Sequence, residues 1–406
     1  MFTTSVIRHP AAGGPYLRIE NSIKALSQIS ELFLHCRTLL SAPELEYYQQ
    51  ICRGVTCDPA PDFQDRLARR LRGVINTFFI RILKKKVLPD PINYLNLLRA
   101  AEDLRPDIIW LGYGNISYPL VRYLKENTGY PVVCDTDSVW SRFLLRGHPF
   151  ARTEADRKKI VQEGKAKEEE ERWGTQLADM TTAVSETDAE YYRKLARSPH
   201  QVRIFSNVID LSEYADTPRK PDNFRNPCIC LTGTFWAGSP MEEAVRWMIR
   251  DVVPRIRERI PDLHFYILGR GSDTVLEDVR DSGITVTGEV PSVLPYLSSA
   301  DAAVVPLRFE SGTRFKILEA GACGVPVVST TLGAEGIPIT PGLDILIADD
   351  PETFADDVVQ LLSNPGYAHQ MGSRLNALVR ENYDLGTLVA EGREIIDALL
   401  PGCGWE

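Results

Sequence analysis

The chain has 406 residues, of which 44% are hydrophobic and 25% are charged, so it can bury large cores, most simply in two domains. Its formal net charge of −9 argues against nucleic acid as a partner, because binding a phosphate backbone needs a basic field. The eight cysteines show neither zinc nor disulfide spacing, and no apolar run reaches the roughly 18 residues of a membrane span. We therefore expect a cytoplasmic chain with reduced thiols.

The first half of the chain alternates between strand and helix patterns. Residues 2–7 form a predicted strand, a turn with Gly13 and Gly14 follows, and apolar residues then recur at helical spacing as far as Ile29. A strand, a glycine turn and a helix are the opening of a doubly wound α/β domain. Further strands are predicted at 31–35, 107–111, 131–134 and 180–184, and one more strand at 203–210 runs into a loop.

A second α/β unit follows a polar, proline-rich stretch at 211–227, which we interpret as a linker. Parallel strands with right-handed crossovers are the expected topology. The sequence predicts an N-terminal domain at 1–210 and a C-terminal domain at 211–385, with 386–406 packing back on the first. Strands are predicted at 228–231, 264–268, 285–287, 302–305 and 325–329, and helices at 352–363, 367–382 and 387–400.

Residues 66–87 are basic and amphipathic, which is unusual in an acidic chain. One interpretation is docking on an anionic lipid surface, which would place the chain on the inner face of the cytoplasmic membrane. The other is an ordinary helix whose apolar face packs on a sheet.

The stretch 310–329 (ESGTRFKILEAGACGVPVVS) contains the main functional signal. We predict a helix over 311–323, and a helical plot places Lys316 and Glu319 on one narrow polar sector between apolar faces. A simple ion pair could explain these two residues. It explains less well Arg314 and the Ser-Gly-Thr start, which together resemble an anion site at a helix N-terminus. The pattern therefore indicates a binding site for a nucleoside diphosphate, with Glu319 facing the ribose.

Here the sequence resembles glycosyltransferase family 4, the retaining nucleotide-sugar glycosyltransferases of the GT-B fold, and within it a branch that makes bacterial polysaccharides. The resemblance is carried by Glu319-Ala, by Gly324-Val-Pro-Val-Val-Ser and by Thr331-Leu-Gly-Ala-Glu-Gly. It implies two Rossmann-like domains facing a cleft, with the C-terminal helix returning to the first. It also implies a UDP- or GDP-sugar donor, no cofactor or metal, and a glycan, lipid-linked or protein acceptor.

The resemblance also implies roles for single residues in donor binding. Glu319 matches the second glutamate of the family's Glu, seven residues, Glu motif; the first should stand at 319 − 8 = 311, where this chain has Ser311, with Glu310 one place early. Relatives carry Arg and Lys after the glycine turn that Gly233 and Thr234 match, but this chain has Phe-Trp-Ala-Gly-Ser-Pro there. Arg314 and Lys316 are therefore our candidates to neutralise the diphosphate. Gly233 and Thr234 would still approach the donor through their backbone. The remaining donor-binding candidates are Ser311, Gly312, Thr313 and Val290, the last at the edge of the base pocket.

On the N-terminal side of the cleft, Asp135 and Asp137 follow a predicted strand at the carboxyl edge of its sheet. We interpret Asp137, and secondly Asp135, as contacts to the acceptor hydroxyl or the donor sugar; a metal pair and a helix cap are the alternatives. Gly13 and Gly14 permit close backbone approach to the donor or acceptor. His9, just before this turn, is a further candidate to face the cleft.

Three other functions compete with a glycosyltransferase. A catalytically inactive homologue acting as a binding or scaffold subunit stays open because Ser311 replaces the glutamate and the His-Asp pair of many relatives is absent. A nucleotide-sugar epimerase would need acid and base motifs that we do not find. A dinucleotide dehydrogenase would need a Gly-x-Gly-x-x-Gly turn, which is missing after the early strands.

Overall fold

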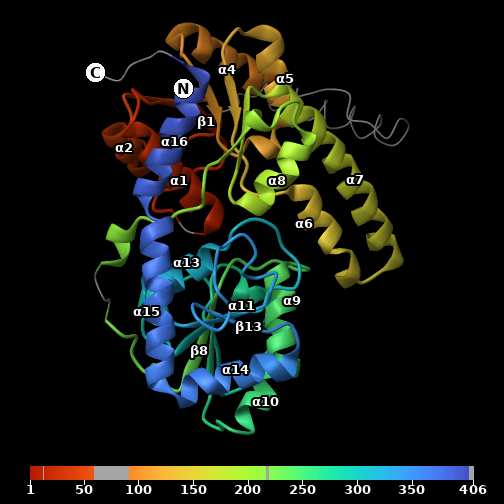
Figure 1. Cartoon of the computed structure of the whole chain (residues 1–406), viewed down its shortest axis with the longest axis vertical. Coiled ribbons are helices and arrows are strands. Elements are labelled where there is room, and N and C mark those ends of the chain that lie inside the picture. Colours follow the sequence, from red (N-terminus) through yellow and green to blue (C-terminus); the bar gives the residue numbers. More distant parts are fainter. Residues whose placement is uncertain (12, 59–90, 216–218, 402–406) are drawn as a thin grey trace.

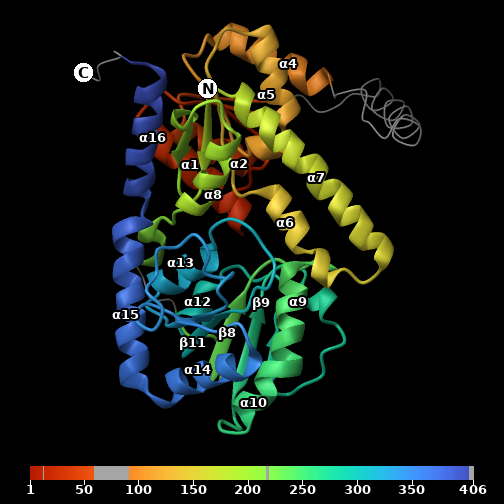
Figure 2. The same ribbon diagram turned by 45° about the vertical axis from the view of Figure 1, so that its right-hand side comes forward.

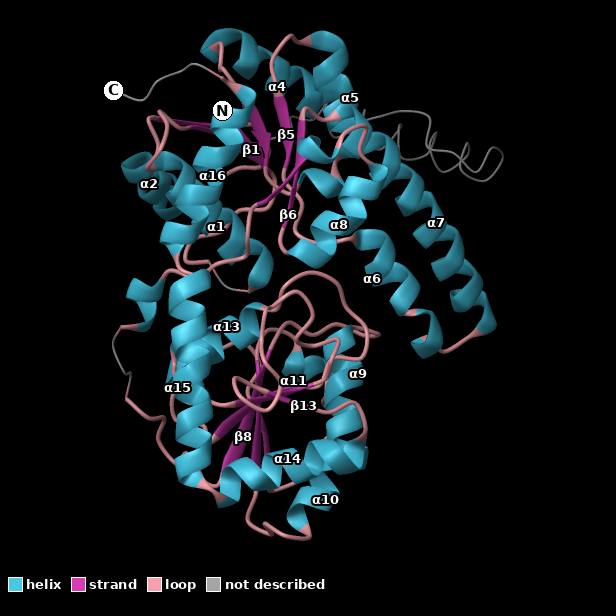
Figure 3. Ribbon diagram, viewed as in Figure 1, coloured by secondary structure: helices cyan, strands magenta, loops and turns pink. Residues whose placement is uncertain are grey.

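The computed structural model describes residues 1–11, 13–58, 91–215 and 219–401. Two parallel sheets form the centres of two domains stacked along the long axis of the molecule, and helices enclose both sheets (Figures 1 and 3). The segment 66–87, for which we weighed a membrane role, lies outside the described residues.

The first sheet has the strand order β3-β2-β1-β4-β5-β6-β7, and the second has the order β10-β9-β8-β11-β12-β13. The reversals beside β1 and β8 are the switch points at which doubly wound sheets bind ligands. The strands of the first sheet are β1 (Phe2–Thr4), β2 (Phe33–Cys36), β3 (Gly54–Cys57), β4 (Ile109–Leu111), β5 (Val132–Cys134), β6 (Met180–Ala183) and β7 (Val202–Ile204). Those of the second are β8 (Cys228–Thr232), β9 (His264–Leu268), β10 (Ile284–Val286), β11 (Ala302–Val305), β12 (Val327–Ser329) and β13 (Leu346–Ile347).

The helices that cover the sheets follow the predicted alternation. Around the first sheet lie α1 (Gly14–Ser27), α2 (Ala42–Ile51), α4 (Pro91–Leu104), α5 (Tyr118–Asn127), α6 (Trp140–Arg146), α7 (Glu154–Leu177) and α8 (Glu186–Leu195). The second has α9 (Pro240–Trp247), α10 (Val253–Arg257), α11 (Ser272–Val275), α12 (Leu294–Leu297), α13 (Phe315–Ala322), α14 (Pro351–Ser363) and α15 (Pro365–Asn382), and the chain ends with α16 (Leu385–Leu399). Central strands such as β11 are wholly buried, as expected where helices cover both faces of a parallel sheet.

Helix α16 returns to the first domain, which confirms that part of the predicted fold. Its Leu388 and Ile395 are buried in the same core as α1. At Gly392 a β-carbon would lie only 3.2 Å from Leu26, so the small residue lets the two helices approach closely. Figures 1 and 2 show α15 and α16 running along one side of both domains.

Two chain crossings therefore join the domains, and they lie side by side. The amide of Ile209 donates to the carbonyl of Tyr383 at 3.0 Å, and Ile209 forms an isolated parallel bridge with Asp384. A short 3-10 helix, Leu211–Tyr214, begins the stretch that we predicted as the linker. The exact domain boundaries stay predictions.

The sequence failed to predict two short edge strands, β3 and β13. Strand β3 includes Gly54 and an exposed Thr56, and β13 has only two residues, so neither carries a hydrophobic pattern long enough to recognise. Edge strands are exposed along one side and need less apolar sequence than central ones.

Candidate functional site

The predicted helix over 311–323 is wrong at its start, because α13 begins at Phe315. Gly312 has φ +81°, a left-handed conformation outside the helical region, and Thr313 donates its hydroxyl to the carbonyl of Val184 at 3.3 Å. Ser311 accepts a hydrogen bond from the amide of Val139 at 3.2 Å. These contacts with the first domain hold residues 311–313 as a buried loop instead of a first helical turn.

Glycine is required at position 312 for a second reason. A β-carbon there would lie 2.7 Å from the carbonyl oxygen of Asp137, on the opposite wall of the cleft. The loop therefore presses directly on the segment that contains one of the predicted acceptor-side carboxylates. The structure thus brings Gly312 and Asp137, predicted for opposite walls, into close contact.

Arg314 stands immediately before α13 and is only 4% exposed. One of its terminal nitrogens donates to the carbonyl of Leu332 at 3.2 Å, while Nε and the other terminal nitrogen are buried without a hydrogen-bond partner. Burial lowers the pKa of this guanidinium, and the charges of Glu310, Glu335 and Asp188 oppose that shift. Two unsatisfied donors on a buried cation are costly and indicate a place for an anion.

Lys316 and Glu319 are partly buried on α13. They form no ion pair with each other, and the Lys316 ammonium has no hydrogen-bond partner among the described residues. Burial lowers the pKa of Lys316, while the negative charge of Glu310 acts in the opposite direction. The simple ion pair considered from the sequence is therefore not the role of this lysine here.

Burial also raises the pKa of Glu319 to about 7, while Lys316 and a hydrogen bond from Tyr214 act in the opposite direction. The Tyr214 hydroxyl donates to Oε1 of Glu319 at 3.3 Å. The carboxylate is thus held by one oxygen, in a position to accept further hydrogen bonds through the other.

Glu310 accepts a hydrogen bond from the amide of Ser311 at 3.1 Å. Its charge acts on both Arg314 and Lys316, so the carboxylate lies among the cations that we predicted for the diphosphate. Arg146 of α6 donates to the carbonyl of Glu310 at 2.8 Å from across the cleft.

The glycine turn before α1 faces the second domain. A β-carbon at Gly13, where φ is +87°, would lie 3.5 Å from Oγ1 of Thr234, and one at Gly14 would lie 3.1 Å from the ring of Phe315. Gly233 precedes Thr234, and its backbone lies close to that of Gly269. A β-carbon added at Gly269 would lie 1.8 Å from the Gly233 carbonyl oxygen. The structure therefore brings the two predicted glycine turns together with the start of α13.

The two aspartates after β5 have different surroundings. Asp135 is fully buried and pairs with Arg18 of α1, and Thr182 donates to its Oδ1 at 2.7 Å. Asp137 accepts hydrogen bonds through Oδ1 from the amide side chain of Asn115 at 2.7 Å and from the indole of Trp140 at 3.0 Å. It does not cap α6, whose N-cap is Val139. Asp137 is thus the better placed of the two to meet a substrate.

His9 lies at the edge of this wall. Its Nδ1 is 2.9 Å from Oε2 of Glu20, and its ring stacks on Tyr47 with centroids 3.4 Å apart. Its neighbour Arg8 reaches across the cleft to Glu289 at 3.1 Å, next to Val290 in the loop that we predicted to edge the base pocket.

Sequence reasoning missed three residues. Arg146 makes a bidentate ion pair with Glu335 across the cleft, at 2.7 and 2.8 Å. Arg18 also donates to the carbonyl of Phe205 and the side chain of Asn207, tying α1 to the start of the crossing. The third is Tyr214. Each lies far along the chain from its partner, so no local pattern could have found it.

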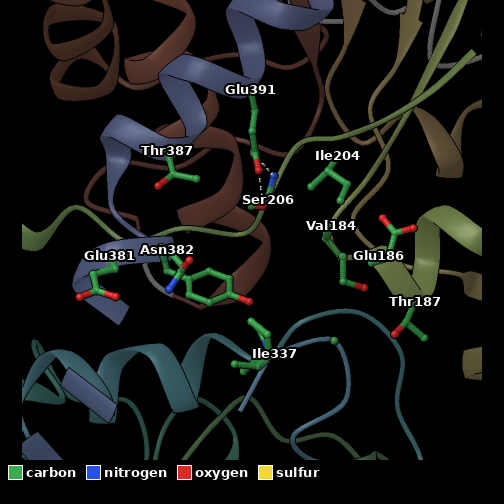
Figure 4. Close-up of a pocket in the computed structure, with 14 residues that line it drawn as sticks. Val184, Glu186, Thr187, Ile204, Ser206, Ile337, Glu381, Asn382, Thr387 and Glu391 are labelled. Atoms are coloured by element: carbon green, nitrogen blue, oxygen red, sulfur yellow. Dashed lines mark hydrogen bonds between the residues drawn. The ribbon is translucent and has the colours of Figure 1, made fainter. Parts of the chain in front are cut away.

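A cavity of about 430 Å³ lies between the domains at the crossings (Figure 4). Glu391 of α16 closes one side by accepting hydrogen bonds from the amide and hydroxyl of Ser206, both at 2.7 Å. None of the predicted donor-site residues lines it.

Over the described ranges, no group of three or more His, Cys, Asp and Glu side chains could hold a metal ion. The seven described cysteines are free thiols. None of the described helices has the length and hydropathy needed to cross a membrane.

Two family models match the chain. The model described as "Glycosyltransferase Family 4" matches residues 52–213, and the one described as "Glycosyl transferases group 1" matches residues 226–364. The chain belongs to glycosyltransferase family 4. The two matches fall on the two domains of this family 4 chain in the order expected of the GT-B fold.

Three curated relatives align with parts of the chain. An uncharacterised 44.6 kDa protein in the cps region of Klebsiella pneumoniae is 22% identical over 41% of this chain and 46% of its own length. The D-inositol 3-phosphate glycosyltransferase of Paenarthrobacter aurescens is 32% identical over 32% of this chain and 34% of its own. A GDP-mannose-dependent phosphatidylinositol monomannoside mannosyltransferase of Mycolicibacterium smegmatis is 28% identical over 37% of this chain and 43% of its own length. The aligned regions thus span less than half of each relative.

Solved structures match over nearly the whole chain. Anabaena HepE, in complex with UDP and glucose, superposes with a TM-score of 0.66 at 11% identity and covers 98% of both chains. The sucrose-phosphate synthase of Thermosynechococcus elongatus superposes with a TM-score of 0.69 at 16% identity, also over 98% of both. These likenesses confirm the predicted GT-B fold.

Proposed function

We propose that this chain is a glycosyltransferase that moves a sugar from a nucleoside-diphosphate sugar to an acceptor hydroxyl, with retention and without a metal, in the synthesis of a glycan or glycoconjugate. The observation that carries the proposal is the pair of cations at the start of α13. Arg314 has two buried donors without partners, and Lys316 has no partner within the described part of the chain. A diphosphate supplies the acceptors that these donors lack.

In the proposed reaction the bond between the sugar and the diphosphate breaks and its electron pair leaves with the nucleotide. Arg314 and Lys316 would stabilise the negative charge that develops on the departing diphosphate, which is electrostatic catalysis. Glu319 would accept hydrogen bonds from the ribose hydroxyls, while Ser311, Gly312 and Thr313 would line the phosphate and sugar end. Asp137 would orient the acceptor hydroxyl from the facing wall.

Contacts across the cleft support a closed state for this chemistry. Arg8–Glu289 and Arg146–Glu335 join the walls on their exposed sides, and Gly13 and Gly14 meet Thr234 and Phe315 between them. Closure would exclude water from the bond that breaks. It would also require the domains to separate for the donor to enter, because loop 311–313 is packed on the first domain.

UDP and GDP are the nucleotides to test first. The HepE complexes contain UDP, and the mannosyltransferase of M. smegmatis is described as GDP-mannose-dependent. We propose a cytoplasmic location with the acceptor being a glycan, a lipid-linked sugar or a protein. Peripheral contact with the membrane through residues 66–87 is a part of this proposal that vesicle binding can test.

The decisive experiment measures release of nucleoside diphosphate from a panel of UDP- and GDP-sugars, with Glu319→Gln and Lys316→Ala beside the wild type. We expect release by the wild type from at least one donor and a loss of about 100-fold in each variant. The matched control is Lys159→Ala on exposed α7, which should behave as the wild type. Wild-type activity in Glu319→Gln would overturn the site assignment.

A binding or scaffold subunit is the second candidate. It is favoured by Ser311 in place of the motif glutamate and by the engagement of Asp135 with Arg18. That function predicts thermal stabilisation by a nucleoside diphosphate but no turnover of any sugar in the panel.

A further inference from the structure

Tyr214 is the last residue of the short 3-10 helix in the linker, and its side chain contacts Glu319 of α13. Its hydroxyl donates to Oε1 of Glu319 at 3.3 Å, and burial, followed by the charge of Glu319, raises its pKa well above the ordinary value. Tyr214 therefore stays protonated and acts as a hydrogen-bond donor. Oε2 of Glu319 makes no hydrogen bond with the described residues.

The other side of the same short helix is fixed to the first domain. Lys24 of α1 pairs with Glu213 at 2.8 Å and with Asp210 at 3.0 Å, and Asp210 caps the short helix through the amide of Ser212. The linker thus connects α1, which starts at the glycine turn, to the carboxylate of Glu319. A displacement of the domains would move Tyr214 relative to one of them.

Other charged or titratable groups near Glu319 come from α13 and β8. Lys316 lies one turn earlier on α13, Cys323 is the C-cap that follows this helix, and Cys230 lies on β8. Burial raises the pKa of Cys323 to about 12 and that of Cys230 well above its usual range, so both thiols stay neutral. Lys316 and Tyr214 are therefore the groups that favour the carboxylate form of Glu319 against its burial.

We propose that Tyr214 is a positioning residue for the donor nucleotide: its hydroxyl fixes Oε1 of Glu319, so that Oε2 is presented to the ribose hydroxyls when the linker is in its closed position. This inference rests on the proposed function, in which Glu319 binds the ribose. Tyr214 itself touches no reacting atom. It makes the nucleotide affinity depend on the conformation of the linker.

The test measures binding of UDP and GDP by calorimetry between pH 6 and pH 9, with the wild type, Tyr214→Phe, Glu319→Gln and the double variant. Loss of the Tyr214 hydroxyl raises the pKa of Glu319 above about 7, so more of it is protonated near neutral pH. We expect Tyr214→Phe to bind about threefold to tenfold more weakly at pH 6.5, for a pKa rise of up to about one unit. At pH 9, where Glu319 is ionised in both proteins, a smaller loss should remain because Oε1 is no longer fixed. Comparison with the wild type at each pH removes the titration of the nucleotide itself.

The double variant should bind no more weakly than Glu319→Gln alone, because the tyrosine acts through the glutamate. Tyr367→Phe, which removes a hydroxyl that donates to the carbonyl of Gly342 at 3.3 Å, is the matched control and should leave binding unchanged. Circular dichroism of each variant checks folding.

The possible results separate the two proposals. Wild-type affinity in Glu319→Gln, or no binding of either nucleotide to the wild type, would contradict the proposed function and with it this inference. Weak binding in Glu319→Gln together with wild-type affinity in Tyr214→Phe at every pH would overturn the role of Tyr214 alone. A loss that is equal at all pH values and additive with the glutamate substitution would also overturn it, because it would show simple packing.

Discussion

The two walls of the cleft are built differently. On the C-terminal wall, one short segment from Glu310 to Glu319 contains most of the polar groups, and within the described structure two nitrogens of Arg314 and the ammonium of Lys316 have no hydrogen-bond partner. On the N-terminal wall, polar groups come from α1, from a short 3-10 helix and from the loop after β5, and they are engaged with the protein itself, as in Arg18–Asp135 and Asn115–Asp137. The difference indicates that the C-terminal wall has donors free to bind an anion. The polar groups of the N-terminal wall are already held in place before a substrate binds.

The largest expected effect is on stability and tests the N-terminal wall. Arg18→Met would leave Asp135 fully buried without its cation, which costs about 3–5 kcal/mol. Urea denaturation should show this loss in the free energy of unfolding. The variant Arg18→Met/Asp135→Leu removes both charges and should recover much of it; no recovery would show that the pair does not act as a unit.

The next effect tests the C-terminal wall through ligand affinity. Arg314→Lys keeps a positive charge but removes the planar guanidinium with its fixed set of N–H donors. We therefore expect calorimetry to show that a nucleoside diphosphate binds about 100-fold more weakly, with little change in melting temperature. Arg219→Lys in the exposed linker is the matched control. Equal affinity in Arg314→Lys would mean that its unpartnered nitrogens do not meet the phosphates.

Asp137→Asn should have a smaller and more selective effect. Asparagine Oδ1 can still accept from Asn115 and Trp140, so the fold is kept while the charge is lost. If Asp137 orients the acceptor, turnover should fall about tenfold with the KM for the donor unchanged. A matching fall in donor hydrolysis without acceptor would instead identify Asp137 as a contact to the donor sugar, the other interpretation of this residue.

The smallest expected effect concerns the contacts that join the walls. Arg146 and Glu335 are about one-quarter exposed, so their pair contributes about 0.2–1 kcal/mol and weakens with salt. Glu335→Gln should lower the thermal stability little but favour an open cleft, seen as a larger radius of gyration in X-ray scattering. An unchanged radius at low and high salt would show that the pair does not control closure.

The sequence predicted α13 because its apolar residues recur at helical spacing, but it placed the start of the helix too early. Spacing could not show that Thr313 bonds to Val184 and that Gly312 lies against Asp137, residues more than 100 positions away. Likewise, Asp135 and Asp137 look alike in the sequence. Only the position of Arg18, on the helix above them, separates a buried structural carboxylate from one that can meet a substrate.

By itself, the sequence determined the local features of this protein: the alternation of strands and helices, the second sheet's strands except β13, the polar sector of α13 and the family. These follow from periodicity and from short contiguous motifs, which every chain carries in its order of residues. The tertiary structure decided which of the charges are left without partners, which loop presses on the opposite wall, and that Tyr214 of the linker holds Glu319. Those properties depend on groups brought together from distant parts of the chain, and partnering and burial exist only after the two domains have closed on each other.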